Sequence, residues 1–169
     1  MSPFLQRLAL IGLLALLPVT GLAAESDFLQ YLQGRWNGSG TVVRRIGTAP
    51  INVNCSLTST AKGPSLSMKG QCRGLLVVSR SISADITANG TRYTGVYVGP
   101  SGGRSALSGS RQGNTINLNV RWAKLVNGDH DATMTITRVG NNGLALQTID
   151  RDPGTGKSLV TSDIKLQRQ

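Results

Sequence analysis

The chain is poor in the residue types from which most catalytic sites are built. Its 169 residues contain only 8 acidic side chains, against 18 lysines and arginines, and a single histidine. Glu25 is the only glutamate, and aromatic residues make up 4% of the chain. A catalytic triad that uses histidine would therefore have to be built around His130. Because no nucleophile is marked beside it, we expect a protein that is not an enzyme and that carries no cofactor.

His130 itself lies between two aspartates, Asp129 and Asp131, directly after the turn residues Asn127 and Gly128. One imidazole with two neighbouring carboxylates lacks the additional converging ligands that a metal centre needs. We interpret the segment 127–131 as a polar hairpin turn and predict no metal site.

Long apolar runs are absent except at the start of the chain. Arg7 precedes an apolar stretch from Leu8 to Leu17, and small residues including Ala23 and Ala24 follow. This order is typical of a secretory signal peptide. A bilayer-spanning helix needs about 20 apolar residues, about twice the length of this run. We predict a signal peptide over 1–24, one domain over 25–169, and a periplasmic or secreted protein that does not span a membrane.

The helix-favouring residues Glu, Lys and Met are scarce, whereas Gly, Thr, Ser, Asn and Val are plentiful. Apolar and polar residues alternate repeatedly, which indicates strands with one buried face. Turn signals such as Asn89-Gly90 separate the alternating runs. Five runs show the alternation well: 51–57, 66–72, 116–122, 132–136 and 160–166. In the last of these, Val160 is expected to share the inward face of Ile164 and Leu166.

Since no long helical connection separates the runs, neighbouring strands should be antiparallel. We predict an all-β fold, a single up-and-down barrel of about 8–10 strands that hides its edges by closure. A short helical segment over 25–33 should lead into it. Glycines at inward positions predict close packing or sharp bends of the barrel; they are Gly38, Gly40, Gly70 and Gly95.

The two cysteines, Cys55 and Cys72, are the only pair available. In an exported protein such a pair favours a disulfide. A turn near Lys62-Gly63-Pro64 would place them opposite one another on adjacent strands. We predict a cross-strand bridge.

The segment from Gly34 to Thr41 reads Gly-Arg-Trp-Asn-Gly-Ser-Gly-Thr and follows the short helical lead-in. This Gly-x-Trp opening resembles that of lipocalins and other calycins, and its extended form resembles small bacterial lipocalin-like and nitrobindin-like barrels. The resemblance implies structural roles for Gly34, Trp36 and Arg168, with the arginine lying across the tryptophan. In nitrobindin-like barrels a histidine from the last part of the barrel holds haem. Because His130 lies elsewhere, haem binding is not expected here.

A net charge of +10 points to an anionic partner. We expect a small amphipathic or anionic ligand, or an anionic envelope lipid or glycan, and no nucleic acid; charge that serves solubility alone is the simpler alternative. The expected ligand-binding residues are Arg80, Arg44, Tyr93, Tyr97 and Trp122. Arg80 shares the alternation phase of Leu76 and Val78 and should point inward. A periplasmic interaction protein, such as a protease inhibitor, is the competing prediction, and the oligomeric state is not predicted.

Overall fold

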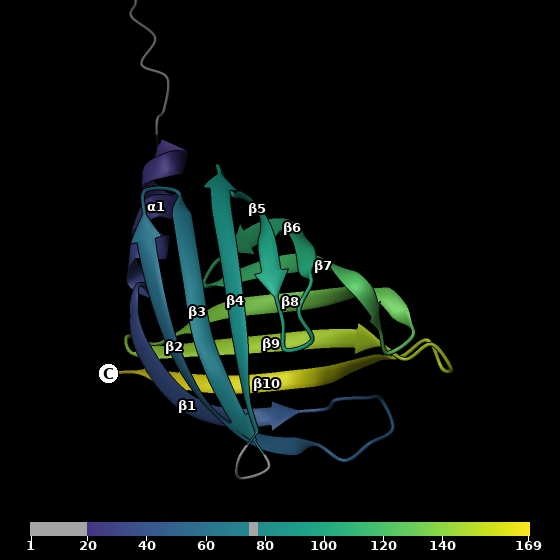
Figure 1. Cartoon of the computed structure of the whole chain (residues 1–169). Helices are drawn as coiled ribbons and strands as arrows, with labels where there is room; N and C mark the ends of the chain where they lie inside the picture. The colour runs from purple at the N-terminus through teal and green to yellow at the C-terminus, as the bar shows by residue number, and fades with distance from the viewer. Residues whose placement is uncertain (1–19, 75–77) are drawn as a thin grey trace, which may run out of the picture.

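The protein is described by a computed structural model that covers residues 20–74 and 78–169, with side chains from residue 23. Ten antiparallel strands form a closed barrel in which each strand pairs with its neighbour along the chain and β1 pairs with β10 (Figure 1). The all-β, up-and-down barrel predicted from the alternation is thus confirmed. The predicted signal peptide lies mostly outside the described residues.

One helix and ten strands make up the fold. They are α1 (Thr20–Leu32), β1 (Gly34–Val42), β2 (Ile51–Lys62), β3 (Ser65–Gly74), β4 (Val78–Asn89), β5 (Arg92–Val98), β6 (Arg104–Gln112), β7 (Thr115–Val126), β8 (Asp129–Val139), β9 (Gly143–Arg151) and β10 (Ser158–Arg168). Figure 1 shows β2 to β4 running steeply through the view, β7 to β10 running across it, and β1 curving from the first direction into the second. Within the described residues no helix is long and apolar enough to cross a membrane.

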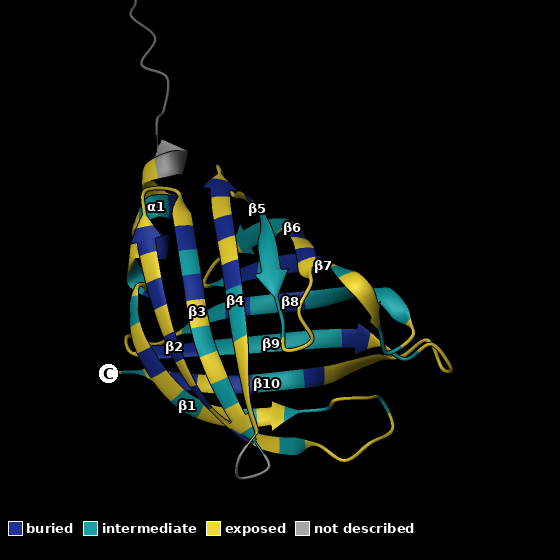
Figure 2. Ribbon diagram, in the orientation of Figure 1, coloured by how far each residue is buried: buried dark blue, intermediate teal, exposed yellow. Residues whose placement is uncertain are grey.

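Alternation of burial follows the strands. Along β2, every second residue from Val53 to Ala61 is buried and the residues between them are exposed (Figure 2). The inward side chains of nearly all strands meet in one core, which contains Met68, Leu118 and Ile136. This periodicity of two is the pattern from which the strands were predicted.

Helix α1 covers one end of the barrel, which we call the helix end. Its apolar side chains Phe28, Leu29 and Leu32 are buried in the barrel core. The helix begins at Thr20, earlier than the predicted segment 25–33, and Glu25 is its first buried side chain among those described. The opposite end carries the loops 43–50 and 99–103 and the hairpin turns after β7 and β9; we call it the open end.

The contact inferred from the lipocalin resemblance is present at the helix end. The guanidinium carbon of Arg168 lies 4.3 Å from the centroid of the Trp36 ring. The same guanidinium donates hydrogen bonds to the carbonyls of Tyr31 and Gln33. These carbonyls belong to the end of α1, where backbone acceptors lack helical partners. Gly34 adopts a φ of 142°, a conformation that strains any residue with a side chain. A Cβ there would also lie 2.5 Å from Arg168 Nη1, so the guanidinium would have to shift.

Neighbouring strands approach closely at the four inward glycines that the sequence marked for close packing or bends, Gly38, Gly40, Gly70 and Gly95, and also at Gly109, which it did not mark. A Cβ on Gly38 would lie 2.0 Å from the carbonyl oxygen of Lys165, and one on Gly109 would lie 1.8 Å from that of Asn117. Side chains at these points would collide with the backbone of the paired strand.

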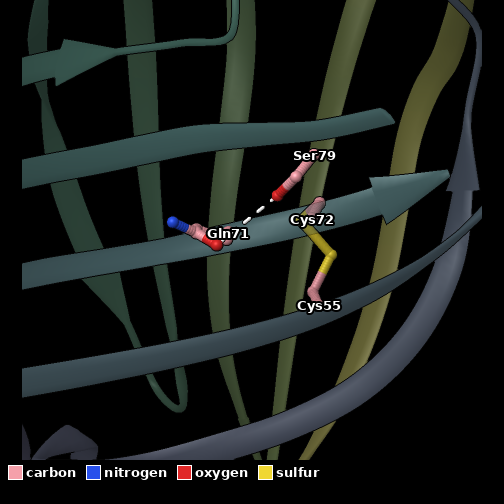
Figure 3. The surroundings of a disulfide bond; sticks show 4 residues. All are labelled: Cys55, Gln71, Cys72 and Ser79. Atoms are coloured by element: carbon pink, nitrogen blue, oxygen red, sulfur yellow. Dashed lines mark hydrogen bonds between the residues drawn. A yellow bond between two sulfur atoms is a disulfide. The ribbon is translucent and has the colours of Figure 1, made fainter. Parts of the chain in front are cut away.

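The disulfide between Cys55 and Cys72 is confirmed. The two residues are direct partners on β2 and β3, with their Cα atoms 4.1 Å apart (Figure 3). Next to the bridge, Ser79 Oγ donates a hydrogen bond of 3.4 Å to the side-chain oxygen of Gln71, which connects β4 to β3.

One prediction about side-chain direction is wrong. Val160 was expected to face inward with Ile164, but it is 49% exposed, whereas Thr161 is 6% exposed. The pairing of β10 with β9 shifts between Val160 and Ser162. An extra residue in one strand reverses the facing of the residues before it, and this bulge turns the hydroxyl of Thr161 into the barrel.

Candidate ligand-binding basin

A basin of about 570 Å³ opens at the open end of the barrel. The ends of β4, β5, β7, β9 and β10 and the loop after β1 form its wall. Arg44, Arg80, Tyr97 and Trp122, which the sequence predicted as ligand-binding residues, all line it. They come from four separate parts of the chain, and barrel closure brings them to one site.

Two aromatic rings form the apolar wall of the basin. Tyr97 and Trp122 meet edge to face, with their ring centroids 6.0 Å apart. Burial raises the pKa of the Tyr97 phenol to about 12. The phenol is therefore neutral at physiological pH and can donate a hydrogen bond to an anion without opposing its charge.

A buried carboxylate holds the tryptophan in place. Asp150 is 4% exposed and accepts a hydrogen bond of 3.3 Å from Trp122 Nε1. Its second oxygen accepts a hydrogen bond from the hydroxyl of Thr161, the residue that the β10 bulge turns inward. These bonds occupy both carboxylate oxygens and fix the orientation of the indole ring.

Sequence analysis assigned no role to Asp150. A signal was present, because Asp150 continues the inward phase of Leu144 and Leu146 along β9. An inward carboxylate near the end of a strand needs hydrogen-bond partners, but only the folded barrel shows that Trp122 and Thr161 supply them.

The basin carries three positively charged side chains, those of Arg44, Arg80 and Lys124. Arg80 pairs with Cys72 across β3 and β4 and lines the basin near its mouth, where the residue is exposed. In the described part of the chain, none of these three groups forms a salt bridge or a side-chain hydrogen bond. Their donors are available to an anion that enters the basin.

Below the basin lies a small cavity of about 60 Å³. It shares Tyr97, Thr148 and Ser162 with the basin and is otherwise lined mainly by apolar side chains, among them Met68 and Met134. The barrel is thus filled through most of its length and hollow at its open end. The site is amphipathic along its depth, with cations at the mouth and an apolar floor.

Tyr93 does not join the other predicted ligand-binding residues. It is 1% exposed at the helix end, where its hydroxyl donates a hydrogen bond of 2.5 Å to Glu25. Burial and the Glu25 carboxylate hold the pKa of Tyr93 far above its usual value. Its partners are protein groups, and it is absent from the basin lining.

His130 is the second residue of β8, which begins with Asp129 directly after the two-residue turn Asn127–Gly128. Its Nδ1 is 3.0 Å from the carbonyl oxygen of Trp122, across the β7–β8 hairpin. In residues 20–74 and 78–169 no group of three or more His, Cys, Asp or Glu side chains is arranged to hold a metal ion.

Comparison with known proteins supports the fold but assigns no activity. No protein-family model matches the chain, and no curated protein matches it. Among solved structures, the crystal structure of Rv2717c from M. tuberculosis is similar, with a TM-score of 0.67 and 20% sequence identity. The likeness covers 88% of this chain and 99% of that one. At this identity it shows a shared barrel fold alone.

Proposed function

We propose that the protein is an exported, non-enzymatic, lipocalin-like carrier that binds a small amphipathic anion in the basin at the open end. The observation that carries the proposal is the convergence of Arg44, Arg80, Tyr97 and Trp122 on one hollow of about 570 Å³. Sites for small molecules typically measure about 300–1,000 Å³ and combine apolar walls with a few polar groups.

Charge supports an anionic ligand. Arg44, Arg80 and Lys124 line the mouth of the basin without an ion-pair partner among the described residues. The one acidic side chain in the lining, Asp150, is engaged by Trp122 and Thr161. A carboxylate, sulfate or phosphate group would therefore meet unpaired guanidinium groups, which form strong charge-assisted hydrogen bonds.

Shape limits the apolar part of the ligand. The cavity beneath the basin measures only about 60 Å³, so a long acyl chain does not fit down the barrel axis. A compact ring or short chain would instead rest against the wall formed by Tyr97 and Trp122, with its charged group toward Arg80. This arrangement distinguishes the proposed ligand from the long-chain lipids that a fully hollow barrel could enclose.

Export is supported by the fold around the predicted cleavage point. Ala23 and Ala24 are exposed, whereas Glu25 is buried and bound to the barrel. Removal of residues 1–24 would therefore leave every described buried contact of α1 intact. The Cys55–Cys72 disulfide is of the kind that persists in oxidising compartments.

Two matched dyes test the proposal. The anionic dye 1-anilinonaphthalene-8-sulfonate should bind with enhanced fluorescence, whereas the neutral analogue N-phenyl-1-naphthylamine should bind more weakly. Arg80→Gln should weaken binding of the anionic dye about tenfold, the effect of losing about 1.4 kcal/mol. Arg92→Gln is the control and should leave binding of the dye unchanged, because Arg92 is an exposed residue at the beginning of β5, at the helix end.

Equal affinity for both dyes, or equal losses in the Arg80 and Arg92 variants, would contradict an anion site in the basin. If the dyes bind as expected, native mass spectrometry of protein purified from its source compartment would identify the natural ligand as an adduct that denaturation releases. A bare protein mass together with absent dye binding would refute the carrier function.

A further inference from the structure

Exposed large apolar side chains are concentrated at one end of the molecule. Leu125 is 65% exposed, Val160 49%, Val78 40% and Leu159 39%, and all four belong to strand ends at the open end. Figure 2 shows exposed stretches at the end of β7 and the beginning of β10. Among the described residues the only other such side chain is Val139, which lies at the helix end.

Each exposed apolar site has a positive charge close by in the chain. Leu125 follows Lys124 directly, Leu159 lies two residues after Lys157, and Val78 lies two residues before Arg80. We call these four apolar residues, with Lys124, Lys157 and Arg80, the open-end rim. Mixed clusters of exposed apolar and cationic side chains are typical of proteins that bind at a membrane surface.

The rim residues are distributed around the mouth of the barrel. They lie on β4, β7 and β10, and in the barrel order two strands separate β10 from β7 and two separate β7 from β4. Apolar and cationic groups therefore surround the opening at three points. A flat partner could contact all three points at once, whereas a small ligand could not.

Four aspartates lie near the rim, at positions 129, 131, 150 and 152, and in the described part of the chain only Asp131 forms a salt bridge. Asp131 forms a salt bridge of 2.8 Å with Arg121, and Asp152 accepts a hydrogen bond of 2.6 Å from Thr155 Oγ1. In contrast, neither Lys124 nor Lys157 has a side-chain partner in the described part of the chain. Asp129, Asp150 and Asp152 accept hydrogen bonds from neutral groups only and keep their negative charges. The cations at this end outnumber them, which gives a net positive charge that complements an anionic surface; they include Arg44, Arg45, Arg80, Arg104, Lys124 and Lys157.

One side of the rim is preassembled by contacts between loops. The backbone N–H of Ile46 donates a hydrogen bond of 2.9 Å to Asn127 Oδ1, which connects the loop after β1 to the β7–β8 turn. A Cβ on Gly128 would lie 3.2 Å from Pro153 Cγ, so this turn also contacts the β9–β10 hairpin. Docking would require little ordering of these segments, which lowers its entropic cost.

We propose that the open-end rim docks onto the surface of an anionic phospholipid bilayer. Leu125, Leu159, Val160 and Val78 would enter the headgroup layer, while Lys124 and Lys157 would contact lipid phosphates. Docking in this orientation turns the mouth of the basin toward the bilayer. The proposal depends on the exposed rim and not on occupancy of the basin, so it stands independently of the carrier function.

Vesicle flotation tests the docking. The mature protein, residues 25–169, should float with vesicles that contain phosphatidylglycerol and phosphatidylcholine. With vesicles of phosphatidylcholine alone it should remain unbound at the bottom of the gradient. Raising the salt concentration should weaken binding, because salt screens the charge contribution. Leu125→Ser should reduce the vesicle affinity about tenfold, the effect expected from removing one leucine from an apolar contact.

Two control substitutions at the helix end make the test specific. Val139→Ser removes an exposed apolar side chain, and Lys62→Glu reverses an exposed charge at the end of β2. Both should bind vesicles as the wild type does, whereas Lys157→Glu should bind several times more weakly. Circular dichroism and the dye affinity of Leu125→Ser should match the wild type, which separates loss of docking from loss of the basin.

The docking proposal is overturned if the wild type fails to float with anionic vesicles, or if it floats equally with neutral ones. Equal losses in Val139→Ser and Leu125→Ser would also overturn it, because adhesion would then be general. Vesicle binding that persists in a protein without dye binding would refute the carrier function and leave the docking surface intact.

Discussion

Glu25 and Arg111, which lie 86 residues apart in the chain, form a salt bridge of 2.7 Å at the helix end. The Glu25 carboxylate also accepts a second hydrogen bond from Arg111 and one from the Tyr93 hydroxyl. The guanidinium carbon of Arg111 lies 4.7 Å from the centroid of the Phe28 ring, on the same helix. The only glutamate in the chain thus anchors α1 to β5 and β6.

Glu25→Gln should lower the free energy of unfolding by about 2 kcal/mol, because charge-assisted hydrogen bonds to a buried group are lost. The side chain of Glu25 is 2% exposed, so water cannot replace Arg111 and Tyr93 as partners. Urea denaturation would measure the change. Asp27→Asn, at an exposed position of the same helix, is the matched control and should change the free energy of unfolding little. Equal losses of stability in both variants would show that removing a negative charge from α1 causes the loss, and not removing the hydrogen bonds of Glu25 to Arg111 and Tyr93.

The same anchor should make stability depend on pH in the acid range. The hydrogen bond from Arg111 holds the pKa of Glu25 below its ordinary value of 4.5. Above that pH the stabilisation is complete. As the pH falls below it, the unfolded chain takes up a proton that the folded protein resists, and stability falls by up to about 1.4 kcal/mol per pH unit.

Denaturation series at decreasing pH would check this dependence. The difference in free energy of unfolding between the wild type and Glu25→Gln should be constant above about pH 5. It should become smaller through the pH range in which glutamate is protonated. A difference that stays constant down to strongly acidic pH would contradict the ionic character of the anchor.

Removal of the disulfide should lower the free energy of unfolding by about 3 kcal/mol, the loop-closure value for a bridge of this span. Cys55 and Cys72 are 17 residues apart and face one another on adjacent strands. The double substitution to serine and chemical reduction of the wild type should give similar losses in denaturation midpoint. A reduced protein as stable as the oxidised one would show that the β2–β3 hairpin is already restricted in the unfolded chain.

Gly109→Ala should destabilise the barrel by about 2 kcal/mol or more, because the added methyl group meets backbone that has little room to move. The new Cβ would lie 1.8 Å from the carbonyl oxygen of Asn117 on β7. Ser108→Ala, at the neighbouring exposed position, is the control. Thermal unfolding of both variants would decide whether the close strand approach at Gly109 requires the absence of a side chain.

Several features of the fold could be predicted because they depend on neighbours along the chain. Strands, hairpin turns and the pairing of Cys55 with Cys72 all follow from a period of two and a short turn. The buried positions Ala84 and Ile86 of β4 follow the same alternation. For these features the local pattern and the tertiary structure agree.

The alternation failed where the tertiary structure inserted a residue. Nothing in the segment 158–162 marks a bulge, and the exposure of Val160 follows from how β10 pairs with β9. Tyr93 and Tyr97 have the same inward phase on β5, yet one meets Glu25 at the helix end and the other lines the basin. Alternation gives the face of a residue but not its depth along the barrel axis.

The sequence by itself therefore determined the strands, their antiparallel order, the disulfide and the positions of close strand approach at glycines, since each depends on local periodicity, short turns or the size of one side chain. The tertiary structure alone decided which distant residues meet. Helix α1 buries Glu25 against Arg111, and barrel closure brings Arg44, Arg80, Tyr97 and Trp122 to one basin above a filled core. These contacts depend on the curvature and stagger of the whole wall, which no short segment of sequence specifies.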